Sequence, residues 1–305
     1  MKISFCKLSL VKEVSVLNTE PSLKELQKLL HRMGNIANES PTYEKLASYI
    51  EKNYMSIIFM TAGELAVEAN ISQGSVSRFC SALGYRGYND FLRSLQKYVS
   101  EEITAPQRLQ YISKNSNNKI CNILNMEHKN IDELEDILSQ TAYKELVQKL
   151  VKTKKIVLIS ARMSSTLLPY TTYILNKIRN NVIQVTPHDP AWDTLTLEEP
   201  ENSLIFALVF PRYPIILINK LQELKEHGFS IAAITDSMMS PIFNLANPLL
   251  PIPITISSIF DIYSTPLLFI NLLMRDVATS IEGLKQRLDG LENIESINHI
   301  YYHKS

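Results

Sequence analysis

The sequence contains few cysteines, and their spacing argues against two classes of protein. Only Cys6, Cys80 and Cys121 occur among 305 residues, and none of them forms a CxxC pair. Closely spaced cysteine pairs are typical of structural zinc sites, and many cysteines in a short chain are typical of secreted disulfide scaffolds. We therefore predict no metal site, no cofactor and no disulfide framework, in keeping with a reducing compartment.

Long apolar runs are also absent. The most apolar stretch, residues 266–274, ends at Arg275 and Asp276, whereas a membrane-spanning helix needs about 20 apolar residues. The first residues include Lys2 but no long apolar core and no small-residue cleavage site, so we expect no signal peptide. The sequence predicts a cytoplasmic protein that has no membrane partner.

An excess of charge of one sign is missing as well. Lys and Arg together number 31, Asp and Glu together number 31, and the formal net charge is zero. Proteins that coat nucleic acid nonspecifically do so through a basic excess that neutralises phosphates. Any recognition of DNA must therefore come from one structural element that is positioned to contact it, and not from the total charge of the protein.

The length and the hydrophobic patterns, in contrast, predict two domains. A chain of 305 residues exceeds what one hydrophobic core usually organises. Apolar residues recur at helical spacing between Ser22 and Tyr98, which predicts an all-α part, and a polar run near Asn117 indicates a linker. The predicted division is an N-terminal extension at 1–17, an all-α domain at 18–98, a linker at 99–118, an α/β domain at 119–290 and a C-terminal tail at 291–305.

The second half alternates short apolar runs with helical patterns. Lead-in helices are expected between Ile120 and Leu138, and the apolar runs follow after Lys154. The runs are 156–159, 182–185, 204–210, 231–234 and 249–252. Strands buried on both faces have this pattern, and their alternation with helices predicts a parallel sheet in a three-layer α/β domain. Ligands of such sheets bind at the carboxyl ends of the strands.

Two short helices joined by a tight turn are predicted around residue 70. Thr61 with Glu64 three residues later forms a capping box, and Ser72 is a good N-cap for the second helix. Asn70 tolerates the left-handed backbone that the turn requires. Apolar residues that can close the small core between the helices are Leu65, Ala66, Ile71, Val76 and Phe79.

The polar side chains of the second helix are the candidates for reading DNA. They are Ser72, Gln73, Ser75, Ser77 and Arg78. They lie on the outer face or near the start of the helix, where a recognition helix meets base edges in the major groove. The alternative is a helical hairpin whose polar residues are merely solvated.

The segment that follows carries a family resemblance. Residues 78–91 read RFCSALGYRGYNDF, and this resembles the "RFC…LGYxGF" stretch that closes the helix-turn-helix in the RpiR family of transcription regulators. Tyr88 stands where the family usually has Phe. Gly84 suits the end of a recognition helix. The resemblance therefore favours the recognition helix over the plain hairpin.

Basic and aromatic residues after the helix are candidates for contact with the DNA backbone. Arg86 lies between Tyr85 and Tyr88, as in a loop that contacts phosphates. Arg93 and Lys97 either extend this contact or are solvated helix residues, and the sequence leaves both possibilities open.

In RpiR-type regulators the DNA-binding module is followed by a sugar isomerase (SIS) domain, and the α/β half resembles one. Many members have a glycine-rich turn after the first strand, with a serine that binds the ligand. Residues 159–165 read ISARMSS, so the glycines are missing but Ser164 and Ser165 remain. Hydroxyls and amides at a helix start suit a phosphate, although simple helix capping is the alternative.

The third run ends in FPRYP at 210–214, which resembles one subgroup of these regulators. The Ser and Thr that normally follow are replaced, starting with Pro214, which suits a first helical position. Arg212, next to Tyr213, can supply charge for a phosphate instead, or it forms a salt bridge.

The fourth run ends in ITDSMMSP at 234–241, a pattern typical of SIS domains. Thr235 and Ser237 face the ligand edge, and Ser240 with Pro241 predicts another helix start. The ligand-binding residues that the resemblance implies are Ser164, Ser165, His188, Arg212, Tyr213, Thr235 and Ser237. His188, after the second run, is either a contact to the sugar or a surface-loop histidine.

The resemblance implies a sequence-specific regulator that senses a phosphorylated sugar or a related metabolite. We expect a homodimer or tetramer on a palindromic operator of double-stranded DNA. One alternative is a degenerate SIS domain used only for oligomerisation. A phosphosugar isomerase is the other, and it needs a positioned base. The acidic residues near the ligand edge offer no convincing base, so we predict no enzyme activity: Asp189, Asp193, Asp236 and Asp261.

Overall fold

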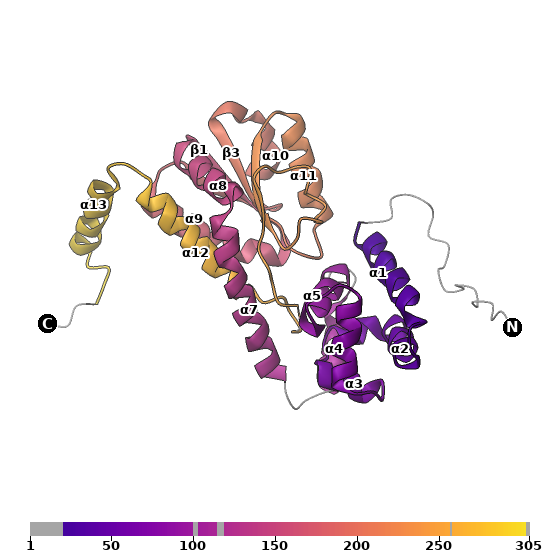
Figure 1. Cartoon of the computed structure of the whole chain (residues 1–305). Helices are drawn as coiled ribbons and strands as arrows, with labels where there is room; N and C mark the ends of the chain where they lie inside the picture. The colour runs from indigo at the N-terminus through magenta and orange to yellow at the C-terminus, as the bar shows by residue number, and fades with distance from the viewer. Residues whose placement is uncertain (1–20, 100–102, 115–118, 257, 303–305) are drawn as a thin grey trace.

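The computed structural model describes residues 21–99, 103–114, 119–256 and 258–302 (Figure 1). The predicted N-terminal extension, 1–17, lies outside the described residues. An all-α part precedes a three-layer α/β part, which confirms the predicted fold class. Within the described part of the chain, no helix is long and apolar enough to cross a membrane.

The described residues of the N-terminal domain, 21–99, form five helices. They are α1 (Pro21–Ala37), α2 (Pro41–Ile57), α3 (Ala62–Glu68), α4 (Gln73–Ala82) and α5 (Tyr88–Val99). Their apolar faces meet in one core that contains the fully buried Leu29, Ile50, Phe79 and Phe91. The ring of Tyr43 packs edge-on against Phe79 at 5.3 Å between centroids, which fixes α2 against α4.

Three helices connect this domain to the sheet. They are α6 (Ala105–Lys114), α7 (Lys119–Ser139) and α8 (Thr141–Lys152). The predicted linker, 99–118, thus contains a helix, and the lead-in helices expected after Ile120 are present. α7 extends from the sheet to the N-terminal domain (Figure 1). This helix therefore contacts both parts of the molecule.

The sheet has five parallel strands in the order β2-β1-β3-β4-β5. They are β1 (Lys155–Ile159), β2 (Val182–Val185), β3 (Ser203–Leu208), β4 (Ser230–Thr235) and β5 (Leu249–Pro251). Each coincides with one of the predicted apolar runs. All six residues of β3 are buried, as expected for a central strand that is covered on both faces.

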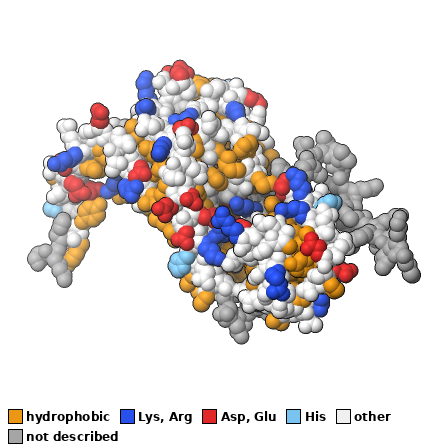
Figure 2. Space-filling model, viewed as in Figure 1, with side chains coloured by type: hydrophobic (Ala, Val, Ile, Leu, Met, Phe, Trp, Pro, Cys, Tyr) orange, Lys and Arg blue, Asp and Glu red, His pale blue; other side chains and the backbone are white. Residues whose placement is uncertain are grey.

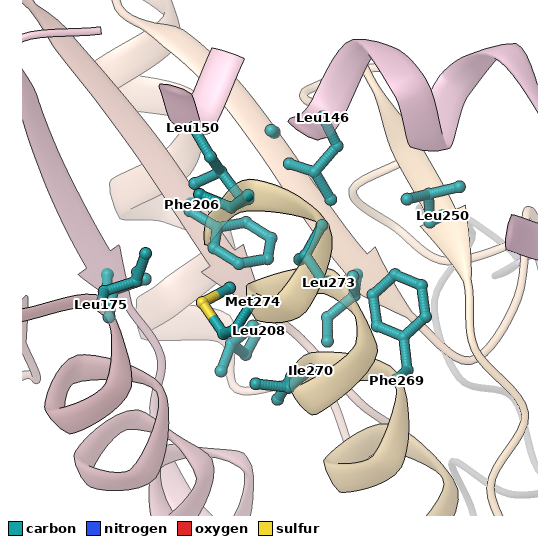
Figure 3. Packing of buried hydrophobic residues seen from close by; sticks show 14 of the residues in the cluster. Leu146, Leu150, Leu175, Phe206, Leu208, Leu250, Phe269, Ile270, Leu273 and Met274 are labelled. Atoms are coloured by element: carbon teal, nitrogen blue, oxygen red, sulfur yellow. The ribbon is translucent and has the colours of Figure 1, made fainter. Parts of the chain in front are cut away.

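Alternate residues of the strands pack into two separate cores. Phe206 and Leu208 face α8, α9 (Leu167–Ile178) and α12 (Ser264–Thr279), as Figure 3 shows. Val157 and Ile205 face the opposite layer, which includes α10 (Ala191–Thr194) and α11 (Ile215–Glu226). The side-chain period of two along each strand produces this division.

The remaining elements lie at the periphery. Short 3₁₀ helices occur in the connections, among them η1 (Arg162–Thr166), η2 (Leu195–Leu197) and η3 (Pro200–Asn202). α13 (Leu284–Ile297) stands apart from the sheet (Figure 1). Arg287 ties it to α9, because its guanidinium donates to the carbonyls of Lys177 and Asn176 at 2.8 and 2.7 Å.

One predicted helix start is wrong. Ser240 and Pro241 open a series of turns and not a helix, and the next strand begins at Leu249. Ile242 is fully buried in the core beside α11, and Pro248 follows shortly afterwards. A proline disfavours helix before it, so the short connection between an anchored Ile242 and β5 leaves no room for several helical turns.

Candidate functional site

The helix pair α3–α4 has the caps that the sequence predicts. The backbone N–H of Thr61 donates to Glu64 Oε2 at 2.7 Å, and the N–H of Glu64 donates to Thr61 Oγ1 at 3.1 Å. Ser72 Oγ accepts from the N–H of Ser75 at 3.1 Å. Asn70 has a φ of 49°, which is the left-handed turn between the helices. The predicted helix-turn-helix geometry is therefore present.

α4 presents one polar face to the outside. Gln73, Ser77 and Arg78 are exposed, whereas Val76 and Phe79 are buried in the core. Ser75 differs from its polar neighbours because only 8% of it is exposed.

Ser75 takes part in a local hydrogen-bond chain at the start of α4. Its Oγ lies 2.8 Å from Ser72 Oγ and accepts from Arg78 Nη2 at 3.1 Å. These hydrogen bonds, which link Ser72, Ser75 and Arg78, restrain the Arg78 guanidinium beside the first turn of the helix. A side chain that is already restrained loses less conformational entropy when it binds a base.

In the loop after α4, some side chains make contacts within the domain and others are exposed. Gly84 has a φ of 90° and follows the end of the helix. The hydroxyl of Tyr85 accepts from Arg32 Nη2 at 2.9 Å, and the Arg32 guanidinium lies 5.5 Å from the centre of the Tyr85 ring. Tyr85 is thus attached to α1, while Arg86 is exposed. Tyr88 is buried and its hydroxyl donates to the carbonyl of Met60 at 2.9 Å, which explains how the core accommodates a tyrosine hydroxyl at this position.

In the α/β domain, the strand order changes direction between β1 and β3. β2 lies on one side of this point and β4 on the other. Such a switch point opens a crevice at the carboxyl ends of the strands, where α/β proteins bind ligands. Ser160 Oγ donates to the carbonyl of Leu208 across the two strand ends at 2.7 Å, so the two loops start from a fixed position.

Each of the two loops at the switch point contains an arginine in the left-handed region. Arg162 follows β1 with a φ of 59°, and Arg212 follows β3 with a φ of 58°. Residues other than glycine pay roughly 1–2 kcal/mol for this conformation, so these are the turns in which glycine is the ordinary choice. Both side chains are exposed, and within the described ranges neither one forms an ion pair. The position of Arg162 directly after a predicted strand also marks it as a candidate ligand contact, although it is not among the residues predicted from the sequence.

The two serines of the first loop lie in η1. Ser164 is buried, and its Oγ lies 3.4 Å from the hydroxyl of Tyr263. Ser165 is partly exposed and donates to the carbonyl of Arg162 at 2.6 Å. Both hydroxyls therefore also have partners within the domain.

The ends of β3 and β4 share a buried carboxylate. The hydroxyl of Tyr213 donates to Asp236 Oδ1 at 2.5 Å, and Thr235 Oγ1 donates to the same oxygen at 3.3 Å. Burial raises the pKa of Asp236, while the Tyr213 hydrogen bond and the charge of Lys97 oppose that rise. Ser237 is buried and its Oγ accepts from the N–H of Met239 at 3.1 Å.

His188 lies at the end of the edge strand β2. It is exposed, and the turn around it is closed by Asp189, whose Oδ2 accepts from the N–H and the hydroxyl of Thr186 at 2.6 and 2.7 Å. These hydrogen bonds lower the pKa of Asp189. β1 separates β2 from β3, so the loop of His188 is not one of the two at the switch point.

Ion pairs connect the two domains. Arg108 of α6 donates to Asp261, before α12, at 2.6 Å, and the side chains are only 3% and 8% exposed. Arg93 of α5 pairs with Glu133 of α7. On the face shown in Figure 2, acidic and basic side chains lie side by side where α7 meets the N-terminal domain.

Comparison with protein families identifies both halves. Residues 25–102 match the helix-turn-helix domain of the rpiR family, and residues 149–275 match the SIS domain. An uncharacterised HTH-type transcriptional regulator of Providencia stuartii is 29% identical over 150 residues, which is 46% of this chain and 50% of that protein. One of Clostridium perfringens is 19% identical over 226 residues, 72% of this chain and 79% of the other. The chain thus spans half the length of the first relative.

Solved structures share the fold. The Vibrio vulnificus NanR protein complexed with ManNAc-6P has a TM-score of 0.51 at 19% identity, covering 88% of this chain and 98% of that one. The sugar isomerase domain of an RpiR transcription factor from Sphaerobacter thermophilus has a TM-score of 0.53 at 15% identity, covering 59% of this chain and 99% of that one.

Proposed function

The chain belongs to the RpiR family of helix-turn-helix regulators with a SIS domain, and from this premise we propose that α4 binds a specific DNA sequence while the switch point of the sheet binds a phosphorylated sugar. The main support for this proposal is that one chain combines two features. One is a capped helix with an exposed polar face, and the other is a parallel sheet with two arginine loops at its switch point.

The surface of α4 supports the DNA half of the proposal. A recognition helix enters the major groove with its first residues toward the base edges, and Gln73, Ser77 and Arg78 are exposed there. An arginine donates two hydrogen bonds to guanine O6 and N7. Arg86, in the exposed loop after the helix, contacts the phosphate backbone in this arrangement.

The two arginine loops support the effector half. A guanidinium matches the geometry of a phosphate through paired hydrogen bonds, and Arg162 and Arg212 have no ion-pair partner within the described residues. They compensate for the hydroxyls that Pro214 and the following isoleucines replace. The NanR structure, which contains a sugar phosphate, supports this class of effector.

The assembly we propose is a cytoplasmic homodimer on a palindromic operator. Two recognition helices related by two-fold symmetry contact half-sites one helical turn, or a multiple of it, apart. Dimers associate further into tetramers only if a second interface exists. A footprint confined to one unrepeated half-site would contradict this pairing.

We propose that the protein senses the sugar without converting it. An isomerase requires a base within reach of the substrate carbon. Three of the candidate carboxylates are already engaged: Asp236 with Tyr213, Asp261 with Arg108 and Asp189 with Thr186.

The test is thermal unfolding of the full chain with a panel of phosphosugars, followed by gel retardation on the DNA upstream of its own gene. We expect one or a few phosphosugars to raise the melting temperature and to change DNA affinity, with no turnover. Turnover would indicate an isomerase. If no phosphosugar stabilises the chain while DNA binding persists, the SIS domain serves only oligomerisation.

A further inference from the structure

A cavity of about 130 Å³ lies between the DNA-binding domain and the carboxyl edge of the sheet. Three parts of the molecule line it: α5, α7 and the strand ends. The charged and polar residues on its walls include Arg93 and Lys97 from α5, Asn130 and Glu133 from α7, and Asp236 after β4.

The cavity adjoins one of the two loops of the proposed effector site, the loop after β3. Pro211, which precedes Arg212, lines it. Asp236, on its wall, accepts the hydrogen bond of Tyr213, which follows Arg212. A ligand held at the β3–α11 loop therefore lies next to a helix of the other domain.

The charges on the walls largely cancel. Arg93 pairs with Glu133, and the positive charge of Lys97 acts on Asp236. Asp90 also lines the cavity, so acids slightly outnumber bases. A phosphate gains little from such surroundings, in contrast to the arginine loops.

The same walls suit the hydroxyls of a sugar. A hydroxyl both donates and accepts hydrogen bonds, and the walls contain an ammonium donor, Lys97, as well as carboxylate acceptors, Asp90 and Asp236. Charge thus distinguishes the two ends of the ligand. The phosphate belongs at the arginine loops, and the hydroxylated body belongs in the cavity.

We propose that the sugar body of the effector binds in this interdomain cavity, with Lys97 of α5 as a direct contact from the DNA-binding domain. This inference rests on the proposed function. Because a single ligand then touches both domains, its binding free energy depends on how the DNA-binding domain is seated. The binding of a particular sugar and the affinity for DNA are therefore coupled through the position of α5.

The contacts of α5 and α7 give a physical reason why the position of α5 depends on sugar binding in the cavity. α7 is fixed to the SIS domain, since Glu127 accepts hydrogen bonds from Ser264 and Thr265 and Asn130 donates to Thr255 Oγ1 at 2.9 Å. α5 is connected to α7 through Arg93 and Glu133 at the rim of the cavity. A ligand that bonds both Lys97 and the β3–α11 loop bridges α5 and the sheet edge, and this shifts the population toward the seating of α5 that permits the bridge.

The experiment compares full-length wild type with Lys97→Met and with a matched control, Lys144→Met, which removes the same charge from an exposed position on α8. Binding of hexose, aminohexose and pentose phosphates is measured by calorimetry. Inorganic phosphate serves as the ligand without a sugar body. DNA affinity is measured with and without each sugar.

We expect Lys97→Met to weaken the responsive phosphosugar about ten- to a hundredfold, as for loss of a charged hydrogen bond. Its binding of inorganic phosphate should stay within about twofold of wild type, and its DNA affinity should no longer depend on the sugar. Lys144→Met should behave as wild type.

Three outcomes would overturn the inference. If Lys97→Met keeps the wild-type sugar response, the cavity is not the sugar site, although the proposed function stands. If it loses DNA affinity without sugar and keeps the sugar response, Lys97 contacts DNA instead. If wild type responds to no phosphosugar, the proposed function and this inference both fail.

Discussion

At the scale of single residues, Arg78 is the side chain on which the proposed base recognition depends. It is exposed on α4 and restrained by Ser75. We predict that Arg78→Ala loses about 1–3 kcal/mol of discrimination between the operator and unrelated DNA. Its unfolding free energy should change by no more than about 0.5 kcal/mol, as at other surface positions. Fluorescence anisotropy with both DNAs at one salt concentration measures this, and an unchanged operator affinity would refute the assignment.

Arg162 permits a prediction in which stability and binding respond differently. Its φ of 59° is strained for any residue with a Cβ. Arg162→Gly and Arg162→Ala both remove the guanidinium, so both should weaken phosphosugar binding. Only Gly relieves the backbone, and we expect it to be about 1 kcal/mol more stable than Ala in urea unfolding. Equal stability of the two variants would mean that the turn is not strained.

Residue roles were predicted from the sequence with uneven success. The caps Thr61 and Ser72 were predicted correctly, because a cap depends on residues three positions apart. The burial of Ser75 and the Tyr213–Asp236 hydrogen bond were not predictable, since they depend on side-chain geometry and on contacts between separate strands. The DNA-binding and ligand-binding roles themselves stay predictions.

At the scale of elements, the start of α4 has both a structural and a binding role. Ser72 caps the helix and stands beside the proposed groove surface. Ser72→Ala should cost about 1 kcal/mol of stability, whereas Ser72→Asp retains the cap and a favourable charge at the helix N-terminus.

The Asp variant also brings a negative charge toward DNA phosphates. We therefore expect normal stability and weakened operator binding from Ser72→Asp, measured by urea unfolding and anisotropy. Operator binding at the wild-type level would contradict the placement of this helix end against DNA.

Elements with strong periodicity were predicted well, and short connections were not. The five strands were found because each is an apolar run buried on both faces. The helix expected after Ser240 failed because local capping preferences compete with the anchoring of Ile242 in the core. The helix α6 inside the predicted linker owes its position to contacts such as Arg108 with Asp261, which no local pattern reveals.

At the scale of the whole molecule, the Arg108–Asp261 pair fixes α6 to the SIS domain. Asp261→Asn leaves Arg108 buried without a carboxylate, and breaking a buried pair in this way costs about 3–5 kcal/mol. The control is Glu198→Gln at the more exposed pair with Lys155, for which a loss below about 1 kcal/mol is expected. Urea unfolding of both variants tests this, and equal losses would show that the buried pair does not stabilise the domain arrangement.

We propose that one chain binds a specific DNA sequence through α4 and changes its DNA affinity when a phosphorylated sugar binds at the edge of its sheet. The most direct test is the affinity of the full chain for the DNA upstream of its gene, titrated by anisotropy at fixed salt with and without each phosphosugar. We predict that at least one phosphosugar changes this affinity about 5- to 150-fold, the usual range of coupling between sites. An affinity that no phosphosugar changes would show that the α/β domain does not couple a sugar phosphate to DNA binding.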